Sequence, residues 1–217
     1  MRLLDLFCGR WGWSQAFAAR GWECVGIDLF EPPEIPAGCT FYQLDILSIS
    51  RVQGWIYGWN FDFICASSPC EQFSVHGMKH FHPNPPYPEL GIKLFNHTRA
   101  ICEASGVPYV MENVRPAQKF VGNATQHCGP FYLWGSGVPP IMPQGITKGI
   151  DVGSSKAVKG MDKEQKRLYR LQFPYNSSFS WSDMRRTSTA KVATIPPELS
   201  NIVADYAERI LEQAGVK

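Results

Sequence analysis

Short apolar segments alternate with segments of helical spacing along the first half of the chain. The apolar segments are rich in Leu, Ile, Val and Phe, which predicts buried strands. The predicted strands cover residues 3–7, 24–28, 41–46, 61–66 and 107–114, and the predicted helices cover residues 15–20, 51–58 and 89–105. This alternation is typical of an α/β protein with a doubly wound, mostly parallel, Rossmann-like sheet.

Special residues mark where several of these elements should begin and end. Ser14 is the expected cap of the first helix, and Gly21 is its expected stop. Glu31–Pro36 contains three prolines, so the helix after the second strand should be missing or very short. Residues 75–88 are rich in His, Pro and aromatic residues and are expected to form a mobile loop over a site. In the helix 89–105 the spacing predicts an inward face of Leu90, Leu94, Ala100 and Ile101.

The pattern changes in the second half of the chain. In Gly122–Lys191, Gly, Pro, Ser and aromatic residues replace the periodic segments, apart from the charged stretch Met161–Leu171, which favours a short helix. A last helix is predicted over Glu198–Gln213, and its apolar face should pack back on the sheet. That face holds Ile202, Val203, Tyr206, Ile210 and Leu211. The expected units are a main domain of residues 1–121 and 192–217 and a small irregular lobe of residues 122–191.

The composition is that of a soluble globular protein, with 44% hydrophobic and 18% charged residues. No segment approaches the roughly 18 apolar residues of a membrane span, and charges interrupt the start too soon for a signal peptide, so a cytoplasmic protein is expected. Seven cysteines without a Cys-x-x-Cys pair favour reduced thiols over disulfides or structural zinc. His76, His80 and His82 have no carboxylate or thiol at ligand spacing, so no metal site is expected.

The net charge of +2 is unevenly distributed along the chain. Residues 148–191 hold ten Lys and Arg against four acids, a net of +6, which leaves −4 for the other residues. A basic segment on a mildly acidic body suits binding to a polyanion. A solvated loop face is the alternative interpretation.

Glycines and acids stand where three predicted strands end. Gly9 and Gly12 follow the first strand, where they let backbone approach a ligand closely. Asp5, Asp28 and Asp45 lie near the ends of successive strands, and an acid after the second strand can bind ribose hydroxyls. Because there is no Gly-Lys-Ser/Thr sequence for phosphates, the pattern favours an adenosine ligand without phosphate, such as S-adenosylmethionine.

A cysteine and a glutamate follow two further strands. Ser68-Pro69-Cys70 ends one strand abruptly, so the thiol sits on a constrained turn at the sheet edge where chemistry collects. Glu112 and Asn113 end the next strand. Thiolate attack on C6 of a pyrimidine needs an acid near N3, which this pair could supply. The alternatives are an inert buried thiol, a salt-bridged glutamate and an asparagine that caps a turn.

Three motifs in this order resemble the DNA (cytosine-5)-methyltransferase family. They are Asp5-Leu6-Phe7-Cys8-Gly9, Ser68-Pro69-Cys70 and Glu112-Asn113-Val114. The resemblance covers residues 1–120, with a weaker similarity over residues 195–210. It implies that Asp28 binds the ribose of S-adenosylmethionine, that Asp45 binds the adenine amine, and that Cys70 adds to C6 of a flipped cytosine held by Glu112. The loop from residue 71 to residue 88 would close over that base.

The resemblance implies three groups of site residues. The predicted catalytic residues are Cys70, Glu112, Asn113 and Pro69. The predicted cofactor-binding residues are Asp5, Phe7, Gly9, Gly12, Asp28, Leu29, Asp45, Ile46 and Ser67. The predicted DNA-binding residues are Arg115, Lys163, Lys166, Arg167, Arg185 and Arg186.

The chain departs from the family pattern at several positions. Trp11 stands where most relatives have a second glycine, and Glu71 stands where they have glutamine. Gln126–Phe131 lacks the arginines of the family's Gln-x-Arg-x-Arg segment, whose work Arg185 and Arg186 are expected to do. Residues 122–191 are too few for a large target-recognition domain, which makes the chain similar to small bacteriophage members of restriction–modification type. Low or short sequence specificity and a monomer are therefore expected.

Other functions stay open at this point. The same chemistry could act on RNA or on a free cytosine nucleotide, because the large recognition domain is missing. Arg10 and Trp11 could favour a sulfonium donor that carries an added carboxylate, although a surface or phosphate contact suits Arg10 better. A catalytically inactive DNA-binding or anti-restriction module is a further alternative, but it would need neither Cys70 nor Glu112.

Overall fold

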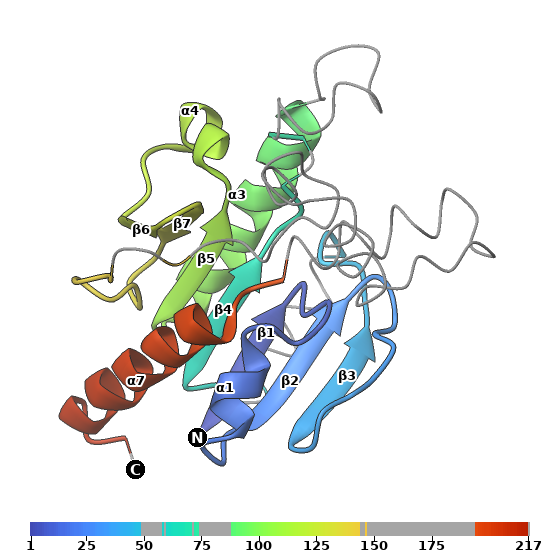
Figure 1. The fold of residues 1–217 in the computed structure, drawn as a ribbon. Coiled ribbons are helices and arrows are strands. Elements are labelled where there is room, and N and C mark those ends of the chain that lie inside the picture. Colours follow the sequence, from blue (N-terminus) through green and yellow to red (C-terminus); the bar gives the residue numbers. More distant parts are fainter. Residues whose placement is uncertain are drawn as a thin grey trace, which may run out of the picture.

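The computed structural model describes residues 1–48, 58, 60–70, 72–73, 88–143, 146 and 194–216. They contain a seven-stranded sheet with the strand order β3-β2-β1-β4-β5-β7-β6 (Figure 1). The strands are β1 (Arg2–Leu6), β2 (Glu23–Asp28), β3 (Cys39–Gln43), β4 (Phe63–Ser67), β5 (Tyr109–Asn113), β6 (Gln126–Cys128) and β7 (Phe131–Trp134). The first five are parallel to one another, β7 runs antiparallel to β5, and β6 runs antiparallel to β7. The predicted doubly wound, mostly parallel sheet is thus confirmed.

Helices cover both faces of this sheet. The helices α1 (Ser14–Ala18) and α7 (Pro197–Gln213) pack together on one face, and α3 (Pro88–Ser105) lies on the other (Figure 1). A 3-10 turn, η1 (Arg115–Ala117), and the short helix α4 (Gln118–Val121) follow β5. No helix in these described segments is long and apolar enough to cross a bilayer.

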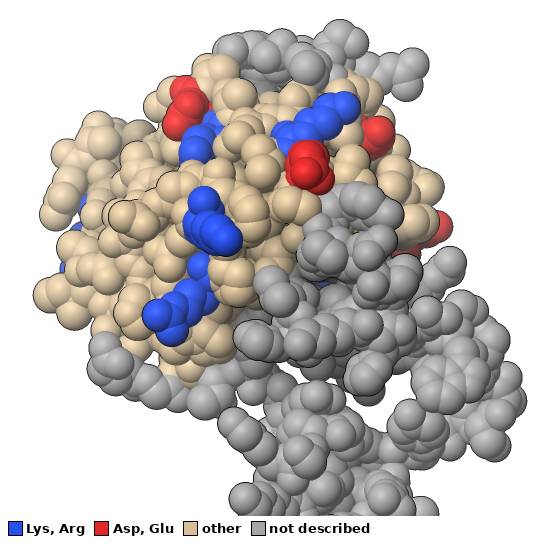
Figure 2. All heavy atoms as spheres, turned by 90° about the horizontal axis from the view of Figure 1, so that it is seen from above, with Lys and Arg blue, Asp and Glu red and all other residues tan. Residues whose placement is uncertain are grey.

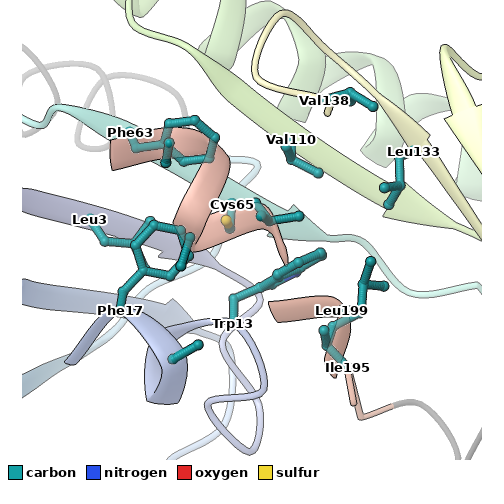
Figure 3. Packing of buried hydrophobic residues seen from close by; sticks show 14 of the residues in the cluster. Leu3, Trp13, Phe17, Phe63, Cys65, Val110, Leu133, Val138, Ile195 and Leu199 are labelled. Atoms are coloured by element: carbon teal, nitrogen blue, oxygen red, sulfur yellow. The ribbon is translucent and has the colours of Figure 1, made fainter. Parts of the chain in front are cut away.

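Each face of the sheet has its own hydrophobic core. On the α1/α7 face, Trp13 and Phe17 pack with Cys65 of β4 and Leu199 of α7 (Figure 3). On the α3 face the core is built around Phe95, whose ring meets the ring of Trp134 edge-on at 5.1 Å. Strands buried on both faces have nearly continuous apolar sequences, which is why β1, β2, β4 and β5 were recognisable without alternation.

The first helix differs in detail from the prediction. Ser14 is the first residue of α1, and the residue before it makes no capping side-chain bond. The hydroxyl of Ser14 instead donates to Asp5 Oδ2 at 2.6 Å, so Ser14 binds the end of β1 rather than the start of its own helix. The predicted stop is confirmed, because Gly21 adopts φ +81° just after the helix.

The buried face of α3 is also different from the expected one. Leu90 is 59% exposed and Ala100 is exposed, although Ile101 is buried as predicted and Leu94 is partly buried. The helix is rotated so that Phe95 enters the core and Gly91 faces Phe73. A β-carbon on Gly91 would lie 2.8 Å from the Phe73 ring, so the close contact between α3 and this ring requires a residue without a side chain. The fully buried set is Gly91, Phe95, Thr98, Ile101 and Cys102.

The sheet continues beyond the point where regular structure was expected to stop. β6 and β7 follow Gly122 and extend the sheet beside β5, so the expected irregularity is wrong for residues 126–134. Strands of three and four residues are too short to show a periodic pattern. The third strand ends at Gln43, so Asp45 lies two residues beyond it. Glu31–Pro36 contains no helix or strand, as predicted.

Several predicted segments lie outside the described residues. They are most of the helix 51–58, nearly all of the loop 75–88, the helix 161–171 and the basic segment 148–191. The last helix is confirmed, and Val203 and Leu211 are buried as expected. Ile202, Tyr206 and Ile210 are only partly buried, because the small residues Ser200, Ala204 and Ala207 share the contact face.

Candidate active site

The carboxyl ends of four parallel strands bring the predicted site residues to one edge of the sheet. Asp5 of β1 is paired in register with Gly26 of β2 and with Cys65 of β4. Ser67, the last residue of β4, is paired with Glu112 of β5. The sheet reverses its winding between β1 and β4, and ligands bind at this edge in such sheets.

The loop after β1 is folded over the end of β2. The backbone N–H groups of Phe7 and Cys8 both donate to the carbonyl of Ile27, at 2.8 and 3.2 Å. Gly9 N–H donates to Asp28 Oδ2 at 3.0 Å. Phe7 and Trp11 have φ values of +63° and +62°, conformations that persist in residues other than glycine only where the surroundings impose them. Such strain is characteristic of ligand-binding loops.

Asp28 keeps capacity for a ligand after these contacts. Its Oδ2 accepts from Gly9, and its Oδ1 accepts from the N–H of Phe30 at 3.2 Å. Because each carboxylate oxygen can accept two hydrogen bonds, the side chain is oriented but still able to accept hydroxyl donors. Leu29 and Phe30 beside it are 52% and 69% exposed, which is the apolar surface that a planar ring would cover.

The segment that contains Asp45 is tied to the end of β2. Leu44 N–H donates to the carbonyl of Asp28 at 3.0 Å, and the Gln43 side chain donates to the carbonyl of Leu29 at 3.0 Å. Asp45 is exposed and accepts from the N–H of Leu47. The structure therefore places Asp28, Leu29 and Asp45 close together, as the sequence predicted.

Ile46 completes this corner of the site. Its side chain is buried, and its carbonyl lies 2.8 Å from Nε2 of His97 on α3. This contact attaches the backbone at Ile46 to α3.

Asp5 is enclosed at the end of β1. Its Oδ2 accepts from the N–H and the hydroxyl of Ser14, and its Oδ1 has no hydrogen-bond partner among the described residues. Burial raises the pKa of Asp5 to about 7, and the charge of Asp28 adds to the rise, while the Ser14 bonds oppose it. A buried carboxyl oxygen without a donor suits a site that receives a positively charged ligand.

Trp11 and Gly12 have packing roles. The Trp11 side chain is 1% exposed and donates from Nε1 to the carbonyl of Glu34 at 2.9 Å. Its ring fills the space above Gly26, where a β-carbon would lie 2.3 Å away. A β-carbon on Gly12 would lie 2.9 Å from the backbone nitrogen of Ile195, so this glycine permits contact with the chain before α7.

These contacts do not favour an unusual methyl donor. The Trp11 ring is enclosed by protein, and Arg10 is an exposed residue. The expectation that the two select a carboxylated donor gains no support from their positions.

The chain before Cys70 is held by hydrogen bonds from two other segments. Trp13 Nε1 donates to Ser67 Oγ at 2.9 Å. Asn113 Nδ2 donates to both the carbonyl and the hydroxyl of Ser68, at 3.0 and 3.1 Å. The carbonyl of Cys70 accepts from Phe73 N–H at 3.0 Å, which closes a turn around the thiol.

Asn113 acts within the protein rather than at its surface. It is fully buried, and its Oδ1 accepts from the N–H of Val114 at 2.8 Å. Its amide therefore connects the end of β5 to Ser68. These are the contacts of a positioning residue, although Asn113 was predicted with the catalytic group.

The seven thiols have different environments. Cys8, Cys65 and Cys102 are buried, and burial raises the pKa of each, which makes them unreactive. Cys70 and Cys39 are the two that are partly exposed. A hydrogen bond from Cys24 lowers the pKa of Cys39, but that residue begins β3 and so lies at the opposite end of the sheet. Cys70 is thus the partly exposed thiol at the edge where the other site residues gather, and Glu112 there is 7% exposed.

The predicted DNA-binding residues are mostly outside the described part of the chain. Arg115 is described, and it is exposed in η1, two residues after Asn113. Lys163, Lys166, Arg167, Arg185 and Arg186 lie outside the described residues. Within the described segments, no group of His, Cys, Asp and Glu could hold a metal ion.

Sequence reasoning missed the residues that orient this site. Trp13, Ser14 and Ser68 hold Ser67, Asp5 and Asn113, respectively. A usable signal existed for Trp13, because a buried indole N–H needs an acceptor.

Comparison with known proteins gives one family. The model of C-5 cytosine-specific DNA methylase matches residues 1–127. No match was found among curated proteins.

Similarities to solved structures are weak. The Bordetella bronchiseptica enzyme WbmH in complex with NAD+ is 15% identical, with a TM-score of 0.35 over 52% of this chain and 55% of that chain. The bifunctional kinase-methyltransferase WbdD is 19% identical, with a TM-score of 0.28 over 51% of this chain and 23% of that chain. The chain thus spans about half of the first and about a quarter of the second, and neither likeness bears on function.

Proposed function

The chain belongs to the family of C-5 cytosine-specific DNA methylases, and we propose that it transfers a methyl group to C5 of cytosine in DNA through a covalent bond to Cys70. The observation that carries the proposal is the pairing of Ser67 with Glu112. It brings the partly exposed thiol three residues further on toward a buried carboxyl group at one sheet edge. A nucleophile and an acid at one edge are what addition to a pyrimidine ring requires.

The methyl donor of this family is S-adenosylmethionine. When bound, it supplies an electrophilic methyl group on a positively charged sulfonium. The donor set at the ends of β1, β2 and β3 fits this molecule. Asp28 would accept the ribose hydroxyls, and Asp45 would accept the adenine amine. The partnerless Oδ1 of Asp5 is consistent with a cationic ligand, and exposed Leu29 would cover the ring.

The chain's own residues would then act on a cytosine that has left the base stack, since C5 and C6 are out of reach inside a duplex. The sulfur of Cys70 forms a bond to C6, and the electrons of the C5–C6 double bond move into the ring while Glu112 protonates N3. C5 would then take the methyl group, whose bond to the sulfonium sulfur would break and leave S-adenosylhomocysteine. Loss of the C5 proton and of the N3 proton restores the double bond, and the bond from C6 to sulfur breaks to release the thiolate of Cys70.

Substitution of Cys70 tests this assignment. Cys70→Ser should abolish methyl transfer and leave S-adenosylmethionine binding intact, because the side chain lies beyond the residues assigned to the cofactor. Tritium transfer to duplex DNA and calorimetric cofactor binding measure the two properties. Cys39→Ser is the matched control, since it removes the other partly exposed thiol from the far end of the sheet. Undiminished transfer by Cys70→Ser would exclude a covalent mechanism at this residue.

A trapped adduct gives a second measurement. In the presence of S-adenosylmethionine, a duplex with 5-fluorocytosine at the target carries both methyl and fluorine on C5 after transfer. Because fluorine cannot leave as the C5 proton does, the bond to Cys70 should persist through denaturing electrophoresis. Cys39→Ser should form this adduct, and Cys70→Ser should not. An adduct with the Cys70→Ser protein would move the nucleophile to another residue.

DNA contacts are proposed for Arg115 and for the basic segment 148–191, a reduced target-recognition region that positions the strand without reading many bases. The net charge of +6 in this segment supports the proposal. Affinity for duplex DNA should fall steeply with salt, by about one power of salt concentration for each phosphate neutralised. An affinity that hardly changes between low and moderate salt would contradict the role of this segment.

RNA or a free cytosine nucleotide is the second candidate substrate. The observation that favours it is the short segment from residue 122 to residue 191, which leaves few residues to read a DNA sequence. Tritium transfer to duplex DNA, transfer RNA and dCMP, measured side by side, separates the three. Mass spectrometry of bases from cells that express the protein would identify the added group as well.

A further inference from the structure

The segment that follows the predicted catalytic glutamate is free of acidic residues. No Asp or Glu occurs between Asn113 and Ile150. Its described part carries the exposed cations Arg115 and Lys119 directly after β5. Seen from above, some basic side chains of the described surface lie apart from the acidic ones, and others lie beside an acidic side chain (Figure 2). A surface of this sign beside the site favours contact with a polyanion.

An aromatic pair lies on the same side of the molecule. The rings of His127 and Tyr132 stack with centroids 5.1 Å apart and planes inclined by 16°. Tyr132 of β7 is paired in register with Asn113 of β5. On its other side, Tyr132 is paired with His127 of the edge strand β6. Residues directly opposite across a sheet point to the same face. The row Asn113–Tyr132–His127 therefore runs outward from the predicted catalytic strand to the sheet edge.

The two members of the pair differ in exposure. Tyr132 is partly buried and packs against the core of the α3 face, so it serves as a support. His127 is exposed. One face of its ring is covered by Tyr132, and the other can take a further planar group.

A second ring connects this surface to the turn that carries Cys70. Phe120 of α4 is 37% exposed and stacks on Phe73 at 5.7 Å, with Lys119 Nζ 5.8 Å from its centroid. Phe73 closes the turn at Cys70 through its backbone N–H. Lys119, the exposed ring of Phe120 and the turn of Cys70 are therefore connected through Phe73.

We propose that Arg115, Lys119, Phe120, His127 and Tyr132 form a surface that binds the DNA strand next to the target cytosine. An unstacked nucleobase stacks on the outer face of His127, and phosphates contact Arg115 and Lys119. Removing a cytosine from a duplex leaves neighbouring bases without a stacking partner, and aromatic side chains take such bases regardless of sequence. His127 lies in Gln126–Phe131, the segment in which the family pattern places arginines. This inference rests on the proposed function, because it assumes a DNA substrate.

Variants of His127 test the stacking contact. His127→Ala should weaken binding of a fluorescein-labelled single strand about tenfold, and a labelled duplex by less, since each base stacked on an aromatic ring contributes appreciably. His127→Phe should restore binding, because it keeps the ring and removes the nitrogens. Arg115→Gln should lower the slope of affinity against salt by about one, whereas His127→Ala should leave that slope unchanged.

A cation and a ring on the far side of the sheet provide the matched control. Arg209 lies 5.6 Å from the ring centroid of Tyr206 on α7, so Arg209→Gln alters similar chemistry away from the site. It should leave DNA binding unchanged. Binding by His127→Ala within about twofold of the parent, or a His127→Phe protein as weak as His127→Ala, would overturn the stacking contact.

The two proposals can fail separately. The Cys70 adduct with 5-fluorocytosine reports the proposed function and does not depend on the strength of the His127 contact at saturating DNA. If the adduct forms while the His127 variants bind normally, the surface is wrong and the function stands. If His127→Ala weakens strand binding but no adduct forms, the surface stands and the transfer reaction is wrong.

Discussion

The ionisation of Asp5 should impose a pH dependence on stability that one substitution removes. The carboxyl group is fully buried, its Oδ2 accepts two bonds from Ser14, and its Oδ1 has no hydrogen-bond partner among the described residues. Burial raises the pKa of Asp5 from 3.8 to about 7. The buried carboxylate is therefore disfavoured in the folded state and not in the unfolded chain.

The sign follows from proton binding. Above pH 3.8 the unfolded chain loses the Asp5 proton while the folded protein keeps it up to about pH 7, so folding is favoured at low pH and the benefit disappears as pH rises through this window. A tenfold difference in proton affinity between the folded and unfolded states corresponds to about 1.4 kcal/mol. The pKa of Asp5 is 3.8 in the unfolded chain and about 7 in the folded protein. The free energy of unfolding should therefore fall by about 4 kcal/mol as the pH rises from about 4 to about 7.

The assay compares the protein with its Asp5→Asn variant. Urea unfolding at several values between about pH 4 and pH 8 gives the free energy of unfolding of each protein. Other acids titrate equally in both, so the difference between the two curves isolates Asp5, and it should shift in favour of the variant by about 4 kcal/mol as pH rises. The nearby thiols of Cys8 and Cys65 stay neutral throughout, because burial raises the pKa of both. Parallel curves would refute the reasoning.

Two further experiments test the contacts of the loop after β1. Gly26→Ala should lower the free energy of unfolding by about 1–3 kcal/mol, because the new β-carbon would lie 2.3 Å from the Trp11 ring. Gly58→Ala, with nothing within 4 Å, is its control and should change stability by less than about 0.5 kcal/mol in the same urea titration. A double-mutant cycle of Trp13→Phe and Ser67→Ala should give a coupling energy of about 0.5–1.5 kcal/mol for the bond of 2.9 Å, and zero coupling would contradict that bond.

The sheet and the edge that gathers the predicted site residues were predictable because both depend on local sequence. Strands buried on both faces, such as Phe63–Ser67, are continuous apolar segments, and their ends are marked by residues that cannot continue them. The carboxyl ends of parallel strands must meet at one edge, so placing Asp28, Cys70 and Glu112 in sequence also places them in space. β2 ends at Asp28 as expected, β4 ends at Ser67, three residues before Cys70, and β5 ends at Asn113, the residue after Glu112.

The remaining features depend on contacts between distant segments. The rotation of α3 is set by Phe95 meeting Trp134 and by Gly91 meeting Phe73, and neither contact can be inferred from spacing within the helix. Ser14 has the sequence features of a helix cap, but its hydroxyl donates instead to the buried carboxyl group of Asp5, nine residues earlier, at 2.6 Å. Sequence patterns report periodicity and local conformational preference. They do not show which of two possible hydrogen-bond or packing partners a residue contacts in the folded protein.

The turn of Cys70 and the glycine loop after β1 are connected by hydrogen bonds, which changes how substitutions in either should be interpreted. Trp13 belongs to the loop that would face the cofactor, yet its indole holds Ser67, and its carbonyl accepts from Ser200 of α7 at 2.7 Å. Asn113 holds the next residue, Ser68, from the opposite side. Because Cys70 follows two residues later on a proline-constrained turn, a change at either anchor should displace the thiol without touching the substrate. A loss of activity in a variant of the glycine loop is therefore no proof of lost cofactor binding, and the Cys70 adduct must be measured beside it.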